Sequence, residues 1–465
     1  MEKSGNLIER FKGDKVVLIV VLLLLMISMI AISGSTSLLA MTANTTRLSI
    51  MTKQAIVSLI GIALMAVCYA IPKIGVFEKL SKAGFIISFV LLAALLTHFS
   101  FKPVIWAEKT NEVYRVINVL GQQFHVFEIV KVAMIMYVSW ACKAVKEDNV
   151  PLLKKIAGIT TGKEHDRHPF AWMDNEWGKL FFYIFIPIGL ISVLILPGSN
   201  SSAVFIGGMM VLTALVGGVD LKKILLLGVI MAGLLASCYG IYRVSDRKVF
   251  SRIGTGLERM ADRPTIDDLF RTRAEEGVNS RTYKKMLKKV QQPYSAKIAI
   301  HEGGMFRKGV GGSTQKYVVP VMYGDFMFSY ILEETGIAGG LAIIILYLSL
   351  MARGVKIVQN CEDSFGRTAA GSLILLIVCQ AFMHIAINLD LGPLTGQTLP
   401  LVSHGSSAFL CFCIAFGVIL SISKHSWERT SAEERQADIE SGRINENGNN
   451  GDINGNGENG ESDEN

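Results

Sequence analysis

Ten apolar segments separated by polar loops constrain this chain more than any other feature of its sequence. Most of them are long enough to cross the ~30 Å hydrocarbon core of a bilayer as helices. Inside a bilayer the backbone must satisfy its own hydrogen bonds, which such helices do. The pattern therefore predicts an all-α polytopic membrane protein of about ten spans. The expected spans are 16–36, 54–75, 84–101, 125–143, 180–197, 202–219, 223–241, 326–351, 369–391 and 401–423.

The distribution of Lys and Arg predicts the orientation of these spans. Basic residues are frequent in the N-terminal segment and after spans two, four, six and eight, and are sparse in the intervening short loops. Short cytoplasmic loops carry this excess, so both termini are expected in the cytoplasm. The segment 242–324 then lies outside, although it holds 17 Lys/Arg against 8 Asp/Glu. Loops longer than ~60 residues largely do not follow this preference of basic residues for the cytoplasmic side. The excess of Lys and Arg in 242–324 nevertheless needs its own explanation.

The expected spans divide the chain into three parts. We expect a cytoplasmic N-terminus at 1–15, a membrane domain at 16–425 and a disordered cytoplasmic tail at 426–465. Residues 431–465 carry 10 acidic and 2 basic groups among Gly and Asn repeats, a composition that predicts disorder. The seven cysteines are scattered and form no CxxC pair, so neither a disulfide framework nor a zinc motif is indicated.

The segment 292–334 holds the most unusual combination of residues. Its glycines are followed by Asp325, which stands at the mouth of a long apolar run. An ionisable group at this place is either a functional residue or a residue exposed at the interface. Backbone N–H groups and cations in the Gly-rich part favour a cradle for an anionic ligand. The segment thus favours a membrane enzyme with an anionic substrate.

Polar groups also occur inside the expected spans. Glu128 and Lys131 are three residues apart and lie on one helix face, either as a buried structural pair or in a polar site. The polar-site reading is favoured, since charges are costly at this depth. The segment 392–409 is irregular at membrane depth, which is tolerated where protein or a wet cavity satisfies the backbone. His384 and His404 are interpreted as polar core residues rather than metal ligands.

The first half of the outer loop contains a basic amphipathic pattern. Residues 264–289 predict one or two helices with several Lys and Arg on one face. Such a face is either a solvated surface or a surface that lies near anionic lipid phosphates. The pattern leaves both interpretations open.

Four stretches together resemble the SEDS family (shape, elongation, division and sporulation) of bacterial cell-wall glycosyltransferases. The first comprises Ala299, Ile300, Gly303, Gly304, Gly309, Gly311, Ser313, Gln315, Lys316, Pro320, Asp325, Phe326, Phe328, Glu333, Glu334 and Gly336. The others comprise Pro393, Thr395, Gly396, Leu399, Pro400, Ser403, Gly405 and Ser407; Gln380 and Asn388; and, in part, Arg115, Ile117, Glu128 and Lys131. The similarity covers 15–425. Val321, Tyr323 and Gly324 replace a Glu, a His and a Thr of the family, which indicates a divergent branch.

The resemblance implies an inverting glycosyltransferase that polymerises lipid II in the bacterial cytoplasmic membrane. It implies that Asp325 is the general base and that Glu128 and Lys131 face the same cavity. The residues expected to bind substrate are Arg115, Gly303, Gly304, Lys316, Thr395, Ser403 and Ser407. A divalent cation, Mg or Mn, is compatible with the leaving pyrophosphate. The expected partners are a class B penicillin-binding transpeptidase and other division proteins, with no role for nucleic acid.

Three alternatives remain open at this stage. A lipid II flippase would also use intramembrane charges and broken helices. A scaffold that only recruits a transpeptidase would leave the polar motifs at membrane depth unexplained. A polymerase for elongation rather than division would have the same chemistry, and the long cytoplasmic loop and acidic tail favour division only weakly.

Overall fold

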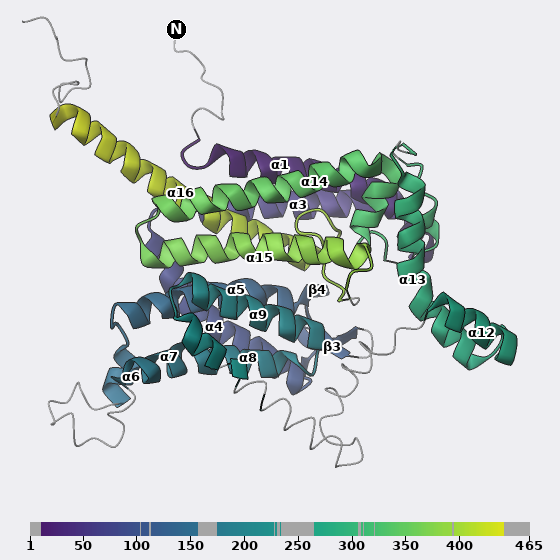
Figure 1. Cartoon of the computed structure of the whole chain (residues 1–465), viewed down its shortest axis with the longest axis horizontal. Helices are drawn as coiled ribbons and strands as arrows, with labels where there is room; N and C mark the ends of the chain where they lie inside the picture. Colours follow the sequence, from purple (N-terminus) through teal and green to yellow (C-terminus); the bar gives the residue numbers. More distant parts are fainter. Residues whose placement is uncertain are drawn as a thin grey trace, which may run out of the picture.

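The computed structural model consists mainly of helices that run side by side along one axis (Figure 1). It describes 11–156 without 103, 111 and 112; 174–229 without 227; 233; 265–305; 308–309; 311–319; 321–392; and 395–440. The first helices are α1 (Lys15–Ser35), α2 (Ser37–Thr42), α3 (Arg47–Ala70), α4 (Ile74–Leu96), α5 (Val126–Lys146) and α6 (Pro151–Ile156). Then come α7 (Glu176–Leu180), η4 (Phe181–Phe185), α8 (Ile186–Ile195), α9 (Asn200–Val216), α12 (Ile266–Glu276) and α13 (Arg281–Gly303). The last are η5 (Gln315–Tyr317), α14 (Met327–Asn360), α15 (Ser364–Asn388) and α16 (Ser406–Glu440).

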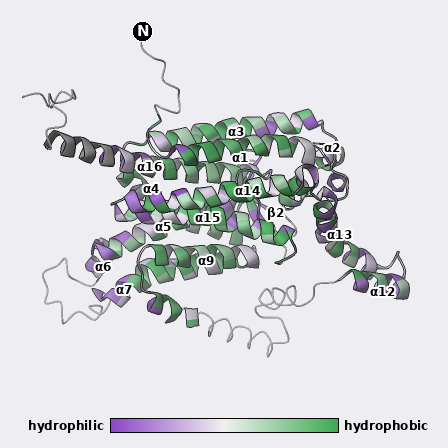
Figure 2. Ribbon diagram, turned by 45° about the horizontal axis from the view of Figure 1, so that its top comes forward, coloured by the Kyte–Doolittle hydropathy of each residue, from purple (hydrophilic) through white to green (hydrophobic). Residues whose placement is uncertain are grey.

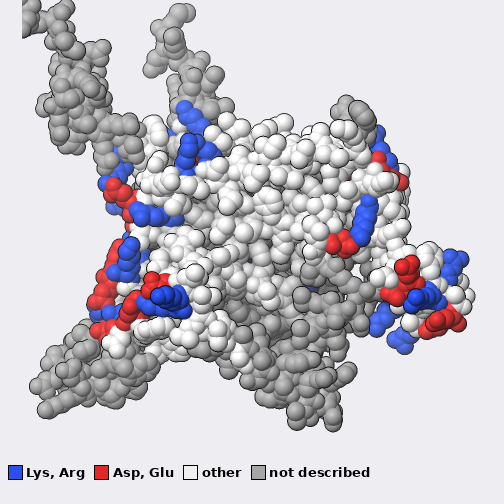
Figure 3. Space-filling model, in the orientation of Figure 1, with Lys and Arg blue, Asp and Glu red and all other residues white. Residues whose placement is uncertain are grey.

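The predicted polytopic membrane architecture is confirmed. Within the described ranges, seven helices are long and apolar enough to cross a membrane: α1, α3, α4, the continuous run α7–α8, α14, α15 and the apolar part of α16. Helix α9 is shorter, and α5 carries several charges. Most of the expected span 223–241 lies outside the described residues. Figure 2 shows hydrophobic residues along these helices, and Figure 3 shows charged residues at both ends of an uncharged belt.

Two hydrophobic clusters form the interior of the helical body. The first is built mainly by α1, α14, α15 and α16, and the second mainly by α4, α5, α8 and α9. Trp140 and Phe205 pack against both clusters. Helix α15 runs across the middle of the body in Figure 1, and several polar residues of α15 and α16 are buried, among them Gln380, His384, Asn388 and Ser407.

The segment between α4 and α5 forms a small antiparallel sheet. Its strands β1 (Ser100–Phe101), β2 (Ile105–Thr110), β3 (Val113–Val119) and β4 (Gln122–His125) lie in the order β1-β2-β3-β4. Strand β4 leads directly into α5. Its end is tied to α16, because Ser407 Oγ accepts from His125 N at 3.1 Å and donates to the carbonyl of Gln123 at 3.2 Å.

The structure differs from the sequence prediction at the end of one helix and inside another. Helix α16 continues to Glu440, which corrects the predicted disorder over 426–440. Residues 432–440 are mostly Ala, Glu, Arg and Gln, which extend an already formed helix at little cost. The remainder of the predicted tail, 441–465, lies outside the described residues. Helix α14 is broken at Gly336, whose φ of 68° and ψ of −170° are not helical.

Of the one or two amphipathic helices expected over 264–289, the structure contains two. Helix α12 begins at a capping box formed by Thr265 and Asp268, and α13 begins at Ser280. Both helices stand at one end of the body in Figure 1. Helix α13 extends further than expected and includes the first part of the Gly-rich segment.

Candidate functional site

Asp325 lies in the turn that precedes α14, at one end of the bundle. It is partly buried, and a Cβ built on Gly396 would meet its Oδ2 at 3.8 Å. The carboxylate therefore faces the loop that joins α15 to α16. Loss of hydration raises the pKa of Asp325 to about 6, because burial disfavours the charged form. A carboxyl with this pKa is ionised for the most part at neutral pH and binds a proton more readily than an exposed aspartate.

One face of α15 holds the backbone around Asp325. Asn388 donates through Nδ2 to the carbonyl of Asp325 at 3.1 Å, and its Oδ1 accepts from Ser329 N and Oγ at 3.0 and 2.7 Å. His384, one turn earlier, donates through Nδ1 to the carbonyl of Gln397 at 2.8 Å and accepts from Phe328 N at 3.4 Å. These contacts satisfy N–H groups at the start of α14 that have no partner within the helix.

Lys131 lies on the inner face of α5, with 1% of its side chain exposed. Its ammonium donates to both carboxylate oxygens of Glu128 at 3.1 and 3.0 Å, to Gln380 Oε1 at 2.6 Å and to Gln397 Oε1 at 3.4 Å. The rings of Phe205 and Phe412 lie 5.7 and 5.6 Å from it. The expected pairing of Glu128 with Lys131 is thus present, and Glu128 remains 16% exposed.

The loop 395–399 connects the surroundings of Asp325 with those of Lys131. Gln397 contacts both regions: its carbonyl accepts from His384, and its side chain accepts from Lys131. Gln380 completes the link, because its Nε2 donates to the carbonyl of Thr398 at 2.9 Å while its Oε1 accepts from Lys131. The structure therefore brings Asp325, Glu128 and Lys131 into one connected polar region.

The expected substrate-binding hydroxyls divide into two kinds. Ser403 and Ser407 are buried and bonded to backbone: Ser403 Oγ donates to the carbonyl of Gly324 at 2.8 Å and accepts from Leu399 N at 2.9 Å. The hydrogen bonds of Ser403 and Ser407 thus fix the loops to which these residues are bonded. The hydroxyl of Thr395 has no hydrogen-bond partner among the described residues. It is buried in this structure, and of the three expected substrate-binding hydroxyls it is the one without a partner in the described part of the chain.

Arg115 lies on β3 and reaches the turn between α8 and α9. Its Nε donates to the carbonyl of Gly198 at 2.8 Å. The bond ties the sheet to the turn at Pro197-Gly198, which joins α8 to α9.

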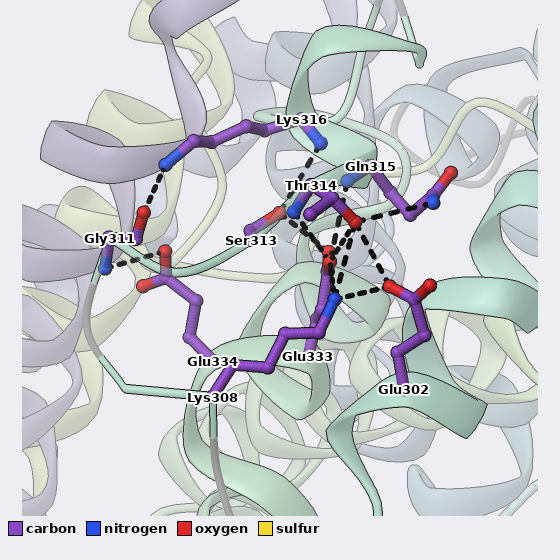
Figure 4. A network of polar contacts seen from close by, with 9 residues as sticks. All are labelled: Glu302, Lys308, Gly311, Ser313, Thr314, Gln315, Lys316, Glu333 and Glu334. Atoms are coloured by element: carbon purple, nitrogen blue, oxygen red, sulfur yellow. Dashed lines mark hydrogen bonds and ion pairs between the residues drawn. The ribbon is translucent and has the colours of Figure 1, made fainter.

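The Gly-rich segment is arranged differently from the expected ligand cradle (Figure 4). Gly303 is packed so closely on α14 that an added Cβ would lie 2.0 Å from the carbonyl oxygen of Leu332. Gly304 has a φ of 49°, and its carbonyl accepts from Ile337 N at 3.1 Å. Lys316 is 2% exposed and donates to the carbonyl of Gly311 at 2.7 Å. The three residues thus connect the loop with α14 or with itself.

The backbone donors of this loop are occupied by two carboxylates of the protein. Thr314 N and Gln315 N donate to Glu333 Oε1 at 2.7 and 3.3 Å, and Gly311 N donates to Glu334 Oε1 at 2.8 Å. The anion that fills the expected cradle is therefore internal. A Gly-rich sequence gives the same signal whether its N–H groups bind a ligand or a carboxylate of the same chain.

Several residues of the site had no role assigned from the sequence. Gln380 and Asn388 matched the family pattern, and their spacing of eight with His384 midway places all three on one face of α15. That spacing was a usable signal. Glu333 also matched the family pattern, but neither its partners nor those of Gln397 could be inferred, because they are distant in the sequence.

Among the described residues, no group of three or more His, Cys, Asp and Glu side chains could hold a metal ion. A cage made of protein ligands alone is thus not found in the described ranges. Mg²⁺ is also commonly held by one or two carboxylates together with substrate phosphates.

Comparisons with known proteins agree with the fold. A family model described as "Cell cycle protein" (FTSW_RODA_SPOVE) matches residues 14–428. A segment of 132 residues is 37% identical to peptidoglycan glycosyltransferase MrdB of Escherichia coli K12, covering 28% of this chain and 36% of that relative. A segment of 133 residues is 36% identical to the probable peptidoglycan glycosyltransferase FtsW of Bacillus subtilis, covering 28% and 33%. The alignments span about a third of these relatives.

Two solved structures share the architecture over nearly the whole chain. One belongs to a study of polymerisation and crosslinking by a peptidoglycan synthase complex, with a TM-score of 0.58, 16% identity and coverage of 90% of this chain and 99% of that one. The other is the rod shape determining protein RodA of Thermus thermophilus, with a TM-score of 0.52, 15% identity and coverage of 90% and 99%. At such identities the likeness establishes the fold alone.

Proposed function

This chain belongs to the FtsW/RodA/SpoVE family of cell cycle proteins, and from that membership we propose that it polymerises lipid II into glycan strands as a peptidoglycan glycosyltransferase. The observation that carries the proposal is the position of Asp325. Its partly buried carboxylate stands at the end of a spanning helix, beside a loop whose Thr395 hydroxyl is unengaged. Relatives that carry the name peptidoglycan glycosyltransferase support the reaction type.

In the proposed mechanism Asp325 is the general base. Its carboxylate accepts the proton of the 4-hydroxyl of the acceptor sugar, and the resulting oxygen nucleophile attacks the anomeric carbon of the donor. The bond from that carbon to the lipid pyrophosphate breaks, with inversion of configuration, and the pyrophosphate leaves with the bonding electron pair. A pKa of about 6 leaves the base free of its proton at pH 7.

Positive charge near this region stabilises the leaving pyrophosphate. Lys131 supplies an ammonium within the connected polar region, and the outer segment 242–324 carries 17 Lys/Arg against 8 Asp/Glu. Phosphate charge that develops in the transition state is stabilised by such groups. A divalent cation, Mg or Mn, would add to this charge if held between Asp325 and the substrate's phosphates. The steps assigned above to the chain's own residues do not depend on it.

The cellular setting belongs to the same proposal. We place both termini in the cytoplasm and Asp325 at the outer face of the bacterial cytoplasmic membrane, as the Lys/Arg distribution indicates. A class B penicillin-binding transpeptidase is the proposed partner, supported by the likeness to a member of a peptidoglycan synthase complex. We assign the protein to septal synthesis with other division proteins, with elongation as the alternative role.

A flippase is the second candidate, and one observation favours it. Helix α14 is broken at Gly336, and Lys131 is buried among the spanning helices, features that transporters also use. Translocation, however, does not require a proton acceptor at the mouth of the bundle.

Purified protein in liposomes that contain labelled lipid II separates the two functions. We expect glycan chains, and we expect Asp325→Asn to reduce their formation by about 10²–10⁴-fold, because only the proton acceptor is removed. Movement of lipid II between leaflets without any chain formation would support the flippase. Wild-type rates of chain formation by Asp325→Asn would refute the proposed base.

A further inference from the structure

Glu333 is the most completely bonded carboxylate in the described part of the chain (Figure 4). It lies in the first segment of α14 and has no exposed surface. Its Oε1 accepts from Thr314 N, Thr314 Oγ1 and Lys308 Nζ at 2.7, 3.1 and 3.2 Å. Its Oε2 accepts from Ser313 Oγ at 2.5 Å. One side chain of α14 therefore holds a whole turn of the outer loop.

The neighbouring backbone strengthens the same attachment. Gly336 breaks α14, which leaves carbonyl and N–H groups without their helical partners. The loop supplies those partners: Gly309 N donates to the carbonyl of Glu334 at 3.1 Å, and Ile337 N donates to the carbonyl of Gly304 at 3.1 Å. The backbone groups that the break leaves without helical partners therefore bond to the loop. The loop is attached to α14 on both sides of Gly336.

Two roles are conceivable for a carboxylate that fills an anion cradle. It could occupy the place of a substrate phosphate and be displaced when the substrate binds. Alternatively, it could be a permanent anchor that always holds the loop. Displacement would leave a fully buried carboxylate without its donors, an arrangement that proteins avoid because an unpaired charge is costly in a dry interior. Since Glu333 has no exposed surface, the anchor is the role that its surroundings favour.

The anchored turn and Asp325 belong to one closed loop. Residues 313–315 are bonded to Glu333, and the chain between these two points carries Asp325. The intervening segment is packed rather than slack, because Val319, Met322 and Phe326 are all buried. Asn388 holds the backbone of Asp325 from the other side. A change at the anchor is therefore transmitted to the carboxylate through packed residues.

We infer that Glu333 is a positioning residue for Asp325, acting through the closed loop 313–333. The inference rests on the proposed function, since it assumes that Asp325 is the base. Glu333 makes no contact with the reacting atoms in this role. It fixes the loop, and the loop fixes the direction and depth of the carboxylate at its middle.

The test compares Glu333→Gln and Glu333→Asp with the control Glu302→Gln in the full-length protein. Glu302 bonds to Lys308 and to Thr314 Oγ1 of the same network but is partly exposed, so its charge contributes little. We expect Glu333→Gln to slow polymerisation by up to about 100-fold, as a small misplacement of a catalytic group can do. Glu333→Asp should recover part of the rate, and Glu302→Gln should remain near wild type.

Two further readouts distinguish positioning from a merely structural role. Hydrogen exchange should accelerate at the amides of 311–315 in Glu333→Gln while other spanning helices stay protected. In the Asp325→Asn background Glu333→Gln should cause no additional loss of rate, because residues that act as a unit are not additive. A global loss of folded protein, with full activity in the folded remainder, would overturn the inference.

The outcomes also separate this inference from the proposed function. An inactive Asp325→Asn together with a fully active Glu333→Gln refutes the inference alone. Losses that multiply in the double variant refute it as well, because Glu333 would then act independently of Asp325. Full activity of Asp325→Asn refutes the proposed base, and with it any route from Glu333 through Asp325.

Discussion

The side-chain amide of Asn388 donates to the backbone carbonyl of Asp325 at 3.1 Å, while its oxygen accepts two bonds from Ser329. One residue at the end of α15 thus fixes both the turn that carries the candidate base and the first turn of α14. Asn388 is buried, so water does not replace these bonds if they are lost. The position of Asp325 therefore depends on this contact between the end of α15 and the start of α14.

Replacement of Asn388 by Leu should therefore reduce both stability and activity. The variant leaves Ser329 N and Oγ without an acceptor in a buried place, which costs about 1–3 kcal/mol. Thermal unfolding in detergent and the polymerisation rate measure the two effects. The control is Ser372→Ala on the same helix, where the hydroxyl is buried and has no hydrogen-bond partner among the described residues. A stable, fully active Asn388→Leu protein would contradict the proposed junction.

The pH dependence of the reaction should report the environment of Asp325. Only the deprotonated carboxylate accepts a proton, so the rate should fall as pH decreases through the pKa of about 6. Below that value we expect roughly a tenfold loss per pH unit in kcat/KM. An acid limb centred near pH 4, as for an exposed aspartate, would show that Asp325 is either hydrated or not the base.

The same pKa predicts how stability changes with pH. Folding raises the pKa of Asp325 from 3.8 to about 6, so between these values the folded protein binds more protons than the unfolded one. Wild-type stability should fall as pH rises through this window, by at most about 3 kcal/mol for a shift of about two units. Asp325→Asn should lack this contribution. Its thermal midpoint should therefore exceed that of wild type above pH 6 and approach it near pH 4; equal midpoints throughout would contradict the desolvation of Asp325.

The sequence predicted those parts of the molecule that depend on local pattern. Long apolar runs identified the spanning helices, because a bilayer admits few other backbones. The spacing of Glu128 and Lys131 predicted their pairing, because residues three apart share a helix face. The basic amphipathic pattern over 264–289 predicted one or two helices, and α12 and α13 lie there.

Features that depend on distant partners were not predictable in this way. The sheet was missed, although β3 is rich in Val, Ile and Tyr, because the segment between the expected spans 84–101 and 125–143 was treated only as a connection. The hydrogen bonds from the Gly-rich loop to Glu333 could not be inferred from the sequence, since a glycine pattern does not reveal which anion the loop surrounds. The elevated pKa of Asp325 arises from burial in the folded chain, which the local sequence does not reveal.

Removal of either partner of the Lys131–Glu128 pair should reduce glycan synthesis strongly while the protein still folds. In Glu128→Gln the Lys131 ammonium keeps its hydrogen bonds to the amide oxygens of Gln380 and Gln397. In Lys131→Met the remaining carboxylate is partly exposed and can be hydrated. The full penalty of about 3–5 kcal/mol for an isolated buried charge is therefore not expected.

Lys131→Met should be the more harmful of the two, because it removes positive charge from the region that we propose faces the phosphates. Ser139→Ala, on the same helix, is the matched control, since its hydroxyl bonds only to the carbonyl of Ile135. Yield, monodispersity and specific activity of the purified variants provide the measurement. Poor accumulation with full specific activity would mean that the pair is structural only.

The contact between α13 and α14 should depend on the absence of a side chain at Gly303. A Cβ at this position would lie 2.0 Å from the carbonyl oxygen of Leu332, and the backbone there cannot move without disturbing the anchored loop. We therefore expect Gly303→Ala to lower stability by about 1–3 kcal/mol, as overpacking commonly does. Gly189→Ala is the control, because a Cβ in α8 at that position meets nothing within 4 Å. Thermal unfolding and hydrogen exchange of α13 measure the effect. If Gly303→Ala unfolds like the control and α13 keeps its protection, the close packing of the two helices is not what holds the outer loop in place.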